Sequence, residues 1–430
     1  FSLLDDNAIT ADHQTRIVPK EVRHTFEENS QYFANALAEF VFFRTYSRWR
    51  DDLGRRETWT ETITRFMDFM KENLKDSLTD SEYAEVEEAM LNQEIVPSMR
   101  LLWASGPAAR STNVAAYNCS YIVPTELRDF SEIMYILMCG SAAGFSVERQ
   151  TVEQLPKIEN QTGNLRETFV VPDSKEGWCD ALLAGLEAWF AGDDIEFDYS
   201  HIRPKGSRLK TMGGRAMGAD PLIDLMSFSK DLLLSNQGRQ LTSLQVHDLI
   251  CKIGEIVEAS GKRRAALISL SDLRDEEMRH AKSGRFYETA PHRSLANNST
   301  VYTQQPTPEE FLEEWVSLIR SNSGERGIFN RGDLLAQMPE RRREMFKDFI
   351  DTAGTNPCGE INLRSKQFCN LTCIVVRPED NEAELKRKIK LATILGTYQA
   401  SLTDFPYLSE EWTTNCREEA LLGVSITGYW

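Results

Sequence analysis

The sequence predicts an α/β protein whose first part is helical. Apolar residues recur at three- and four-residue steps between Thr58 and about Glu94, as on the buried face of a helix. Beyond Pro97, short apolar runs alternate with amphipathic segments, which is typical of a sheet covered by helices. The 430 residues can bury a large core. We therefore expect a helical region over 1–95 and an α/β domain over 96–430.

Each predicted element has its own signal. The first helix starts near Thr58, and Thr79 with the two residues after it marks the cap of a second helix. The apolar face of the first helix comprises Ile63, Phe66, Met67, Met70 and Leu74. In the α/β domain, residues 118–123 predict a strand, 130–139 a helix and 144–147 another strand. Residues 221–234 predict a further apolar helix.

Composition excludes several classes of protein. Hydrophobic residues make up 41% and charged residues 27%, as in a globular enzyme. A net charge of −17, from 49 basic and 66 acidic residues, argues against an electrostatic nucleic-acid surface. No run of 18 apolar residues and no leader pattern is present, so neither a membrane span nor secretion is expected. The eight cysteines lack a framework spacing, which predicts a reducing, cytoplasmic protein with a few working thiols.

Residues 356–360, Asn-Pro-Cys-Gly-Glu, place an amide, a thiol and a carboxylate within five positions, and Cys369 follows after ten intervening residues. Pro357 restricts one backbone angle and Gly359 frees another, so the thiol of Cys358 is expected at the tip of a tight loop. A thiol that has lost its hydrogen atom can take one from a carbon, and the carboxylate and amide can hold and deprotonate hydroxyls. The grouping suits radical chemistry on a sugar. The alternative for so short a motif is a turn beside a buried cysteine.

Further segments, in order along the chain, resemble those of one protein family. They are Phe-Arg-Thr-Tyr-Ser-Arg-Trp at 43–49, Glu-Thr-Trp at 57–59, Pro-Ser-Met-Arg-Leu-Leu-Trp at 97–103, Asn-Cys at 118–119, Gly-Phe-Ser-Val at 144–147, Ile-Arg-Pro-Lys-Gly at 202–206, Asn-Asn-Ser at 297–299 and Gly-Thr at 354–355. With these, the chain resembles the catalytic subunit of ribonucleotide reductases, most closely the monomeric adenosylcobalamin-dependent type. The resemblance implies a ten-stranded α/β barrel whose central loop carries the thiol, and reduction of ribonucleotides to 2′-deoxyribonucleotides.

The resemblance also implies roles for single residues. Cys358 matches the transient thiyl radical that takes the 3′ hydrogen of the ribose, Glu360 the base at the 3′ hydroxyl, and Asn356 the amide that holds the hydroxyls. Cys119 and Cys369 match the redox pair, which supplies two reducing equivalents and closes into a disulfide. From the residues alone, an isolated cysteine is more often a buried small hydrophobe.

The substrate site has weaker signals. No phosphate-loop or dinucleotide motif is present. By resemblance, Ser98 supplies a substrate-binding hydroxyl and Gly144 lines the same pocket, although a lone serine is otherwise a helix cap or turn. The family is glycine-rich before that glycine, whereas Ser-Ala-Ala stands here at 141–143. No metal site is expected, because Cys369 and Cys373 lack a second pair at zinc spacing and the histidines stand alone in the sequence.

A glycine-rich segment at 211–220 resembles the loop that passes information from a deoxynucleotide effector to the substrate base. Its candidate residues are Gly213, Gly214, Arg215 and Gly218. The alternative is a flexible surface turn. In dimeric relatives the helix that follows packs in a subunit interface, whereas monomeric relatives carry an insertion instead. The segment between Pro156 and Asp173 is short. A homodimer is therefore expected.

The resemblance leaves the radical source open. Adenosylcobalamin is favoured, and the alternative is a separate ferritin-like metal subunit. The expected partners are a ribonucleoside tri- or diphosphate substrate, the effector and a thioredoxin-like reductant. Residues 422–428 resemble a mid-barrel strand, after which the family continues with further strands and a tail bearing two cysteines, so little multiple-turnover activity is expected of the 430 residues. A nucleotide-binding fragment without catalysis is the alternative from another class, against which the five motif residues argue.

Overall fold

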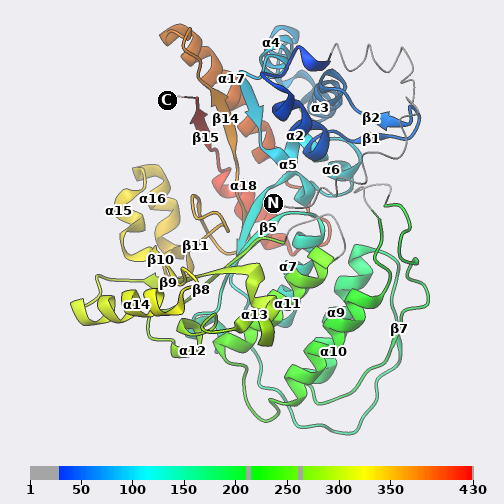
Figure 1. Cartoon of the computed structure of the whole chain (residues 1–430), viewed down its shortest axis with the longest axis vertical. Helices are drawn as coiled ribbons and strands as arrows, with labels where there is room; N and C mark the ends of the chain where they lie inside the picture. The colour runs from blue at the N-terminus through cyan, green and yellow to red at the C-terminus, as the bar shows by residue number, and fades with distance from the viewer. Residues whose placement is uncertain (1–28, 210–214, 260–264, 429–430) are drawn as a thin grey trace, which may run out of the picture.

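A computed structural model describes residues 29–209, 215–259 and 265–428 (Figure 1). The N-terminal part comprises α2 (Ala36–Thr45), the short paired strands β1 (Trp49–Arg50) and β2 (Arg55–Arg56), α3 (Trp59–Leu74) and α4 (Asp80–Leu91). Thr58 and Thr79 begin α3 and α4 with capping boxes, in which the threonine side chain and the glutamate three residues later satisfy each other's backbone amides. The predicted cap at Thr79 is confirmed.

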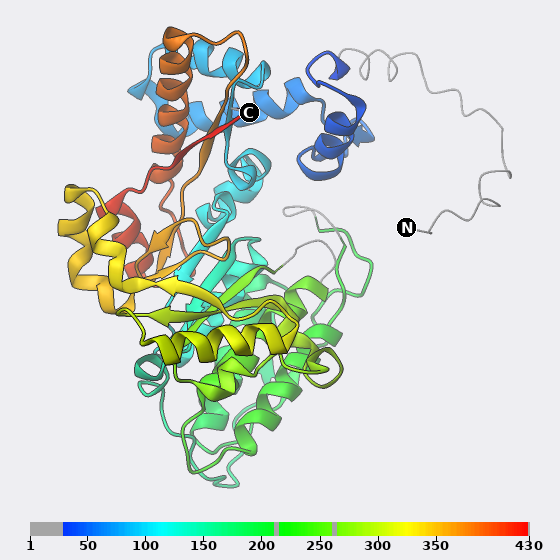
Figure 2. The same ribbon diagram turned by 60° about the vertical axis from the view of Figure 1, so that its left-hand side comes forward.

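The N-terminal helices share one hydrophobic core with the rest of the chain. The ring of Phe66 on α3 packs edge-on against Tyr398 of α17 (Glu382–Ser401), with ring centroids 6.1 Å apart. Figure 2 shows α17 beside these helices, above the main sheet. The strand β3 (Ile95–Pro97) spans the predicted boundary at residue 95 and pairs with a strand near the C-terminal end.

The main sheet has six strands in the order β10-β9-β8-β5-β4-β13. Its strands are β4 (Cys119–Ile122), β5 (Ala142–Ser146), β8 (Leu267–Asp272), β9 (Ala296–Tyr302), β10 (Gly327–Asn330) and β13 (Gln367–Phe368). The first five are parallel, and β13 runs antiparallel to β4. Parallel strands need crossover connections, and each of them here contains at least one helix. The connecting helices include α7 (Leu127–Met138), α9 (Lys175–Phe190), α10 (Asp220–Leu234), α11 (Ser243–Ala259) and α14 (Pro308–Ser321).

A second sheet has three strands in the order β15-β14-β3. β14 (Thr372–Val375) and β15 (Val424–Thr427) are parallel, and β3 is antiparallel to β14. The α/β class is therefore as predicted. In the described part of the chain, however, the strands form these open sheets and not a closed ten-stranded barrel.

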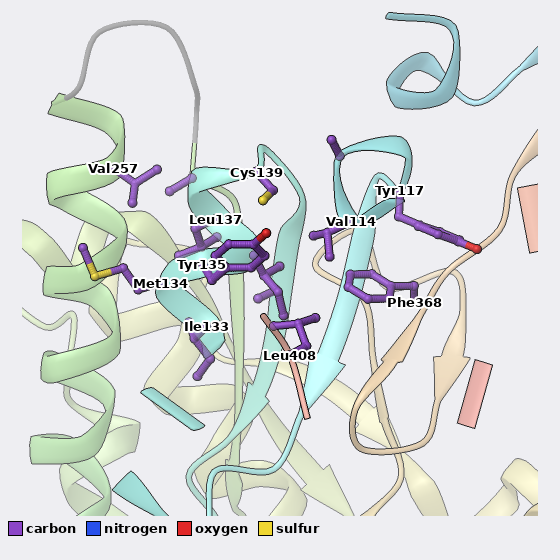
Figure 3. Close-up of a cluster of buried hydrophobic side chains, with 14 of the residues drawn as sticks. Val114, Tyr117, Ile133, Met134, Tyr135, Leu137, Cys139, Val257, Phe368 and Leu408 are labelled. Carbon is purple, nitrogen blue, oxygen red and sulfur yellow. The ribbon is translucent and has the colours of Figure 1, made fainter. Parts of the chain in front are cut away.

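The predicted strands and helices of the α/β domain are found with small shifts. α7 begins at Leu127, before the predicted start, because the carboxylate of Asp129 accepts the backbone N–H groups of Thr125 and Glu126. Apolar side chains of α7 pack in the core with residues of neighbouring elements, among them Tyr117 and Phe368 (Figure 3). None of the described helices is long and apolar enough to cross a membrane.

The remaining elements are short. They are α5 (Met99–Ala104), α6 (Pro107–Ser111), α8 (Arg149–Val152), β6 (Phe169–Val170), β7 (Phe197–Asp198), α12 (Glu276–Arg279), α13 (Phe286–Thr289), α15 (Leu334–Gln337), α16 (Glu340–Phe346), β11 (Gly354–Thr355), β12 (Asn362–Leu363) and α18 (Glu410–Glu419). β11 and β12 matter most for the site, because together they carry the loop with the Asn-Pro-Cys-Gly-Glu motif.

Candidate active site

The motif residues 356–360 lie at the tip of a hairpin. β11 and β12 pair antiparallel, and the tip closes through a hydrogen bond from the Gly359 N–H to the Asn356 carbonyl at 2.9 Å. Gly359 has a φ of +84°, a conformation that favours glycine. Asn356 and Pro357 are buried, whereas Cys358 and Glu360 are exposed. The predicted presentation of the thiol on a tight loop tip is thus what the structure has.

Two strands bring Cys119 and Cys369 together across 250 positions of sequence. Cys119 begins β4, and Cys369 directly follows β13, the antiparallel neighbour of β4. The Cys369 N–H donates to the Cys119 carbonyl at 2.9 Å, and the Cys119 N–H donates to the Cys369 sulfur at 3.2 Å. The rings of Tyr117 and Phe368, which precede these cysteines, stack with centroids 5.0 Å apart and help to hold the two segments together.

The third thiol joins this pair. The thiol of Cys119 is within hydrogen-bonding reach of both Cys358 and Cys369. The contact with Cys119, followed by burial and the nearby Glu360 carboxylate, raises the pKa of Cys358. At Cys119, the hydrogen bond from Cys358 lowers the pKa, but the contact with Cys369 and burial outweigh it and the net shift is upward. Both groups are therefore neutral thiols near pH 7, the form that carries a transferable hydrogen atom.

Asn356 offers a hydrogen-bond donor beside these thiols. Its Oδ1 accepts the Ile361 N–H at 3.0 Å and the Thr355 hydroxyl at 3.3 Å, which fixes the orientation of the amide. Its Nδ2 is buried, makes no hydrogen bond to nitrogen or oxygen within the described residues, and lies against the Cys119 thiol, whose pKa it lowers. A buried donor so poorly satisfied can offer a hydrogen bond to a ligand hydroxyl. The five predicted catalytic residues thus lie together.

Gly144 lies directly beneath the loop. A Cβ atom at this position would sit 2.1 Å from the Thr355 carbonyl oxygen, so only glycine allows the loop backbone to approach β5 this closely. The non-glycine residues before it are accommodated in the core, where the Ser141 hydroxyl donates to the Val114 and Tyr117 carbonyls.

Ser98 is a helix cap in this structure. Its hydroxyl accepts the Leu101 N–H at 3.3 Å at the start of α5 and a hydrogen bond from the Gln399 amide at 2.9 Å. Ser98 is buried directly after the end of β3. This strand pairs with β14, which begins two residues after Asn370.

The predicted effector loop is described only in part. Gly213 and Gly214 lie outside the described residues. Arg215 is exposed, pairs with Arg208 in an antiparallel bridge and donates from Nη1 to the Gly206 carbonyl at 2.9 Å. Gly218 has a φ of +75°. Arg208 and Arg215, on either side of residues 210–214, are thus paired directly after the Ile-Arg-Pro-Lys-Gly stretch.

No group of three metal-ligating side chains occurs within residues 29–209, 215–259 and 265–428. Two histidines that stand far apart in the sequence do meet at one carboxylate. His247 and His292 both face Asp248, at 3.4 and 3.2 Å, and Arg293 binds the same carboxylate through two nitrogens at 2.7 Å. Burial raises the pKa of Asp248, but these three partners hold it far below its usual range.

Sequence reasoning missed three buried residues around the loop. Tyr121 lies on β4 two positions after Cys119, and its ring fills the space over Gly354, where a Cβ atom would come within 2.0 Å of it. Glu148 follows β5 and Arg331 follows β10, and the two form a buried ion pair. No motif marks these residues, since single charged and aromatic residues have no distinctive spacing.

Comparisons with known proteins agree with this geometry. Residues 19–107 match the family model of the ribonucleotide reductase alpha domain, and residues 143–233 match that of the insertion domain of B12-dependent ribonucleotide reductase. The adenosylcobalamin-dependent ribonucleoside-triphosphate reductase of Euglena gracilis is 28% identical over 95% of this chain and 57% of its own length. Its counterpart from Lactobacillus leichmannii is 28% identical over 91% of this chain and 61% of its own length.

A crystal structure of a B12-dependent, class II ribonucleotide reductase has the same fold. It superposes with a TM-score of 0.74 over 94% of this chain and 64% of that chain, at 22% identity. The chain thus spans about three fifths of the length of the relatives it matches.

The insertion-domain match corrects one expectation. It covers the segment between Pro156 and Asp173, where the sequence was expected to lack room for such an insertion. The ground for predicting a homodimer is therefore lost. The resemblance itself is confirmed: this chain is similar along most of its length to adenosylcobalamin-dependent ribonucleoside-triphosphate reductases.

Proposed function

We propose that this chain carries the thiol site of an adenosylcobalamin-dependent ribonucleotide reductase, which reduces ribonucleotides to 2′-deoxyribonucleotides for DNA precursor synthesis. The observation that carries the proposal is the convergence of the Cys119, Cys358 and Cys369 thiols beside the Asn356 amide. A module that only binds nucleotides needs none of these thiols. The similarity to B12-dependent reductases favours this radical source over a separate ferritin-like metal subunit.

In the proposed reaction, each group has one task. The Cys358 thiyl radical takes the 3′ hydrogen atom of the ribose, and Glu360 accepts the proton of the 3′ hydroxyl. The Asn356 Nδ2 donates to a ribose hydroxyl and holds it in place. The 2′ hydroxyl leaves as water after taking a proton from the Cys119 and Cys369 pair. The pair then gives a hydrogen atom to the 2′ carbon and one electron to the resulting 3′ keto group, whose oxygen takes back the proton held by Glu360. In total the two thiols lose two protons and two electrons and close into a disulfide. Cys358 then returns its hydrogen atom to the 3′ carbon.

The loop tip fits a bulky radical source in one respect. Cys358 and its neighbour Gly359 are exposed, so they would face such a group, while the substrate side of the thiol faces the buried Cys119. When bound, adenosylcobalamin supplies the one-electron chemistry that removes the hydrogen atom from the Cys358 thiol. Keeping this thiol protonated until then is the task of its raised pKa.

The remaining parts of the proposal concern partners and the whole fold. We propose a ribonucleoside tri- or diphosphate as substrate, with Ser98 and Gly144 lining its pocket, and a deoxynucleotide effector at the loop that includes Gly213, Gly214, Arg215 and Gly218. A thioredoxin-like protein would reduce the disulfide. The ten-stranded barrel belongs to the full-length protein in this proposal. The eight unpaired cysteines support a reducing, cytoplasmic setting.

The exposed face of α10 argues against a homodimer in which the two subunits contact each other through this helix. The apolar side chains of α10 are largely buried, except for Ile223 at 43% exposure, and its other exposed positions include Asp224, Ser227 and Asp231. Obligate homodimer interfaces are more apolar than this. Light scattering at micromolar concentration decides the point, and a monomer is expected.

The test is a single-turnover assay. The reduced chain is mixed with adenosylcobalamin and a labelled ribonucleoside triphosphate, and deoxynucleotide is measured without an external reductant. We expect at most one deoxynucleotide per chain, and none with Cys358→Ala. If the wild-type chain binds deoxynucleotides but reduces no substrate, the non-catalytic alternative is favoured.

A further inference from the structure

We propose that the buried Glu148–Arg331 ion pair is a positioning device that ties the base of the thiol loop to the sheet and keeps Cys358 against Cys119. The inference rests on the proposed function for its biological meaning. Its test, however, needs neither cofactor nor substrate.

The pair is fully buried and has the strongest geometry that these side chains allow. Arg331 Nη1 and Nη2 donate to the two carboxylate oxygens of Glu148 at 2.7 and 2.6 Å. Their side chains are 3% and 4% exposed. Burial lowers the pKa of Arg331, but the bonds to Glu148 outweigh this and raise it. Fork-to-fork contacts of this kind fix both side chains in one orientation.

The third donor of the guanidinium reaches the loop. Arg331 Nε donates to the Ala353 carbonyl at 2.8 Å, and Ala353 is buried directly before β11, five residues ahead of Cys358. A planar guanidinium with all these bonds cannot rotate without breaking several of them together. The position of Ala353 is therefore coupled to that of Glu148.

The other end of the pair is anchored in the sheet. Glu148 follows β5, and its carboxylate accepts the Ser146 hydroxyl of that strand at 2.9 Å. Arg331 directly follows β10, which lies three places away in the order β10-β9-β8-β5. The pair therefore spans the carboxyl ends of these four parallel strands. It secures the loop on the same strand, β5, whose Gly144 touches the Thr355 carbonyl.

The chain contains a matched control. Arg326 and Glu314 form a second buried two-point pair, here through Nε to Oε1 at 2.7 Å and Nη2 to Oε2 at 2.6 Å, with side chains 1% and 6% exposed. Its further bonds join Glu314 to Arg279, and Arg326 to Ser271 and Asp272 of β8 and to Leu273 directly after it, and none reaches Ala353. Changes in this pair disturb a buried ion pair of the same domain without touching Ala353.

The experiment measures the alkylation of Cys358 by iodoacetamide in the full 430-residue chain. Arg331→Lys keeps the charge but loses the fork, and Glu148→Gln keeps the shape but loses the charge. Arg326→Lys and Glu314→Gln are the controls. Peptide mass spectrometry gives the rate at Cys358 at pH 8.5, with Cys373 as internal reference, well below the unfolding midpoint of each variant.

We expect Cys358 in Arg331→Lys and Glu148→Gln to react about tenfold faster, because a thiol that leaves Cys119 is more accessible and ionises more readily. The Arg326 and Glu314 variants should react within twofold of wild type. The proposal would be overturned if the Arg331 and Glu148 variants reacted no faster than wild type, or if the Arg326 and Glu314 variants were accelerated to the same extent. If Arg331→Lys or Glu148→Gln does not fold, Glu148→Asp, which keeps the charge and shortens the reach, is measured against Glu314→Asp by the same criterion.

Discussion

Two groups of cysteines in this chain have raised pKa values for different reasons. Cys179, Cys251 and Cys416 lie in the core, and burial is the first cause of the shift, which brings Cys416 to about 12. At Cys358 the contact with another thiol is the first cause, and this side chain is exposed. The core thiols behave as small hydrophobes. A raised pKa therefore does not identify a working cysteine, and the proposed roles rest instead on the contact between thiols beside the Asn356 amide.

The sharpest way to break this comparison is to remove one thiol from each group. Cys358→Ala should lower single-turnover deoxynucleotide formation by more than about a thousandfold, because no other group can take the 3′ hydrogen atom. Cys251→Ala on α11 should keep the activity, although it leaves a small cavity. Retention of activity by Cys358→Ala, or its loss in a folded Cys251→Ala chain, would contradict the division into two groups.

The second prediction separates the radical thiol from the reducing pair. Cys369→Ser removes one of the two reducing equivalents, so deoxynucleotide formation should fall to background even though Cys358 is intact. Nucleotide binding, measured by equilibrium dialysis, should stay within about twofold of wild type because Asn356 and Glu360 are unchanged. Cys179→Ser, in the core group, is the matched control and should reduce substrate normally. Normal product yield from Cys369→Ser would remove this residue from the pair.

The third prediction concerns the surface on which the loop rests. Gly144→Ala places a Cβ atom 2.1 Å from the Thr355 carbonyl, so we expect a loss of about 1–3 kcal/mol in the free energy of unfolding, measured in urea, together with faster alkylation of Cys358. Gly254→Ala is the control, because its Cβ atom would meet only the end of the Leu267 side chain, at 2.9 Å, and alanine favours the α11 helix. A Gly144→Ala chain as stable as wild type would contradict the close approach.

The smallest predicted effect concerns a core thiol and the pH dependence of the free energy of unfolding. Burial raises the pKa of Cys179 in the folded chain, so above pH 8.5 this thiol ionises only in the unfolded chain and the folded state loses stability as pH rises. The limiting slope is about 1.4 kcal/mol per pH unit for one thiol. Between pH 8.5 and 10, the free energy of unfolding of Cys179→Ala should fall less steeply with pH than that of wild type. Between pH 6 and 7, the two chains should have the same slope. Equal slopes over both ranges would contradict the assigned shift.

The sequence predicted the motif loop and the α/β class because each depends on local signals. Pro357 restricts one backbone angle and Gly359 permits a positive φ, which together favour a tight tip. The partnership of Cys119 and Cys369 came from the family resemblance alone, since it depends on β13 pairing with β4 across the chain. Glu148, Arg331 and Tyr121 were missed because their roles arise only when distant strand ends meet. The insertion was misjudged because its length was estimated from one short segment.

The most direct test of the central claim is to count products and disulfides in one experiment. After a single turnover of the reduced wild-type chain without external reductant, the disulfide-linked peptides are quantified by mass spectrometry beside the deoxynucleotide formed. The account predicts one Cys119–Cys369 disulfide for each deoxynucleotide, with Cys139, Cys179, Cys251 and Cys416 still reduced. Deoxynucleotide formed without that disulfide, or with a disulfide that includes Cys358, would contradict it.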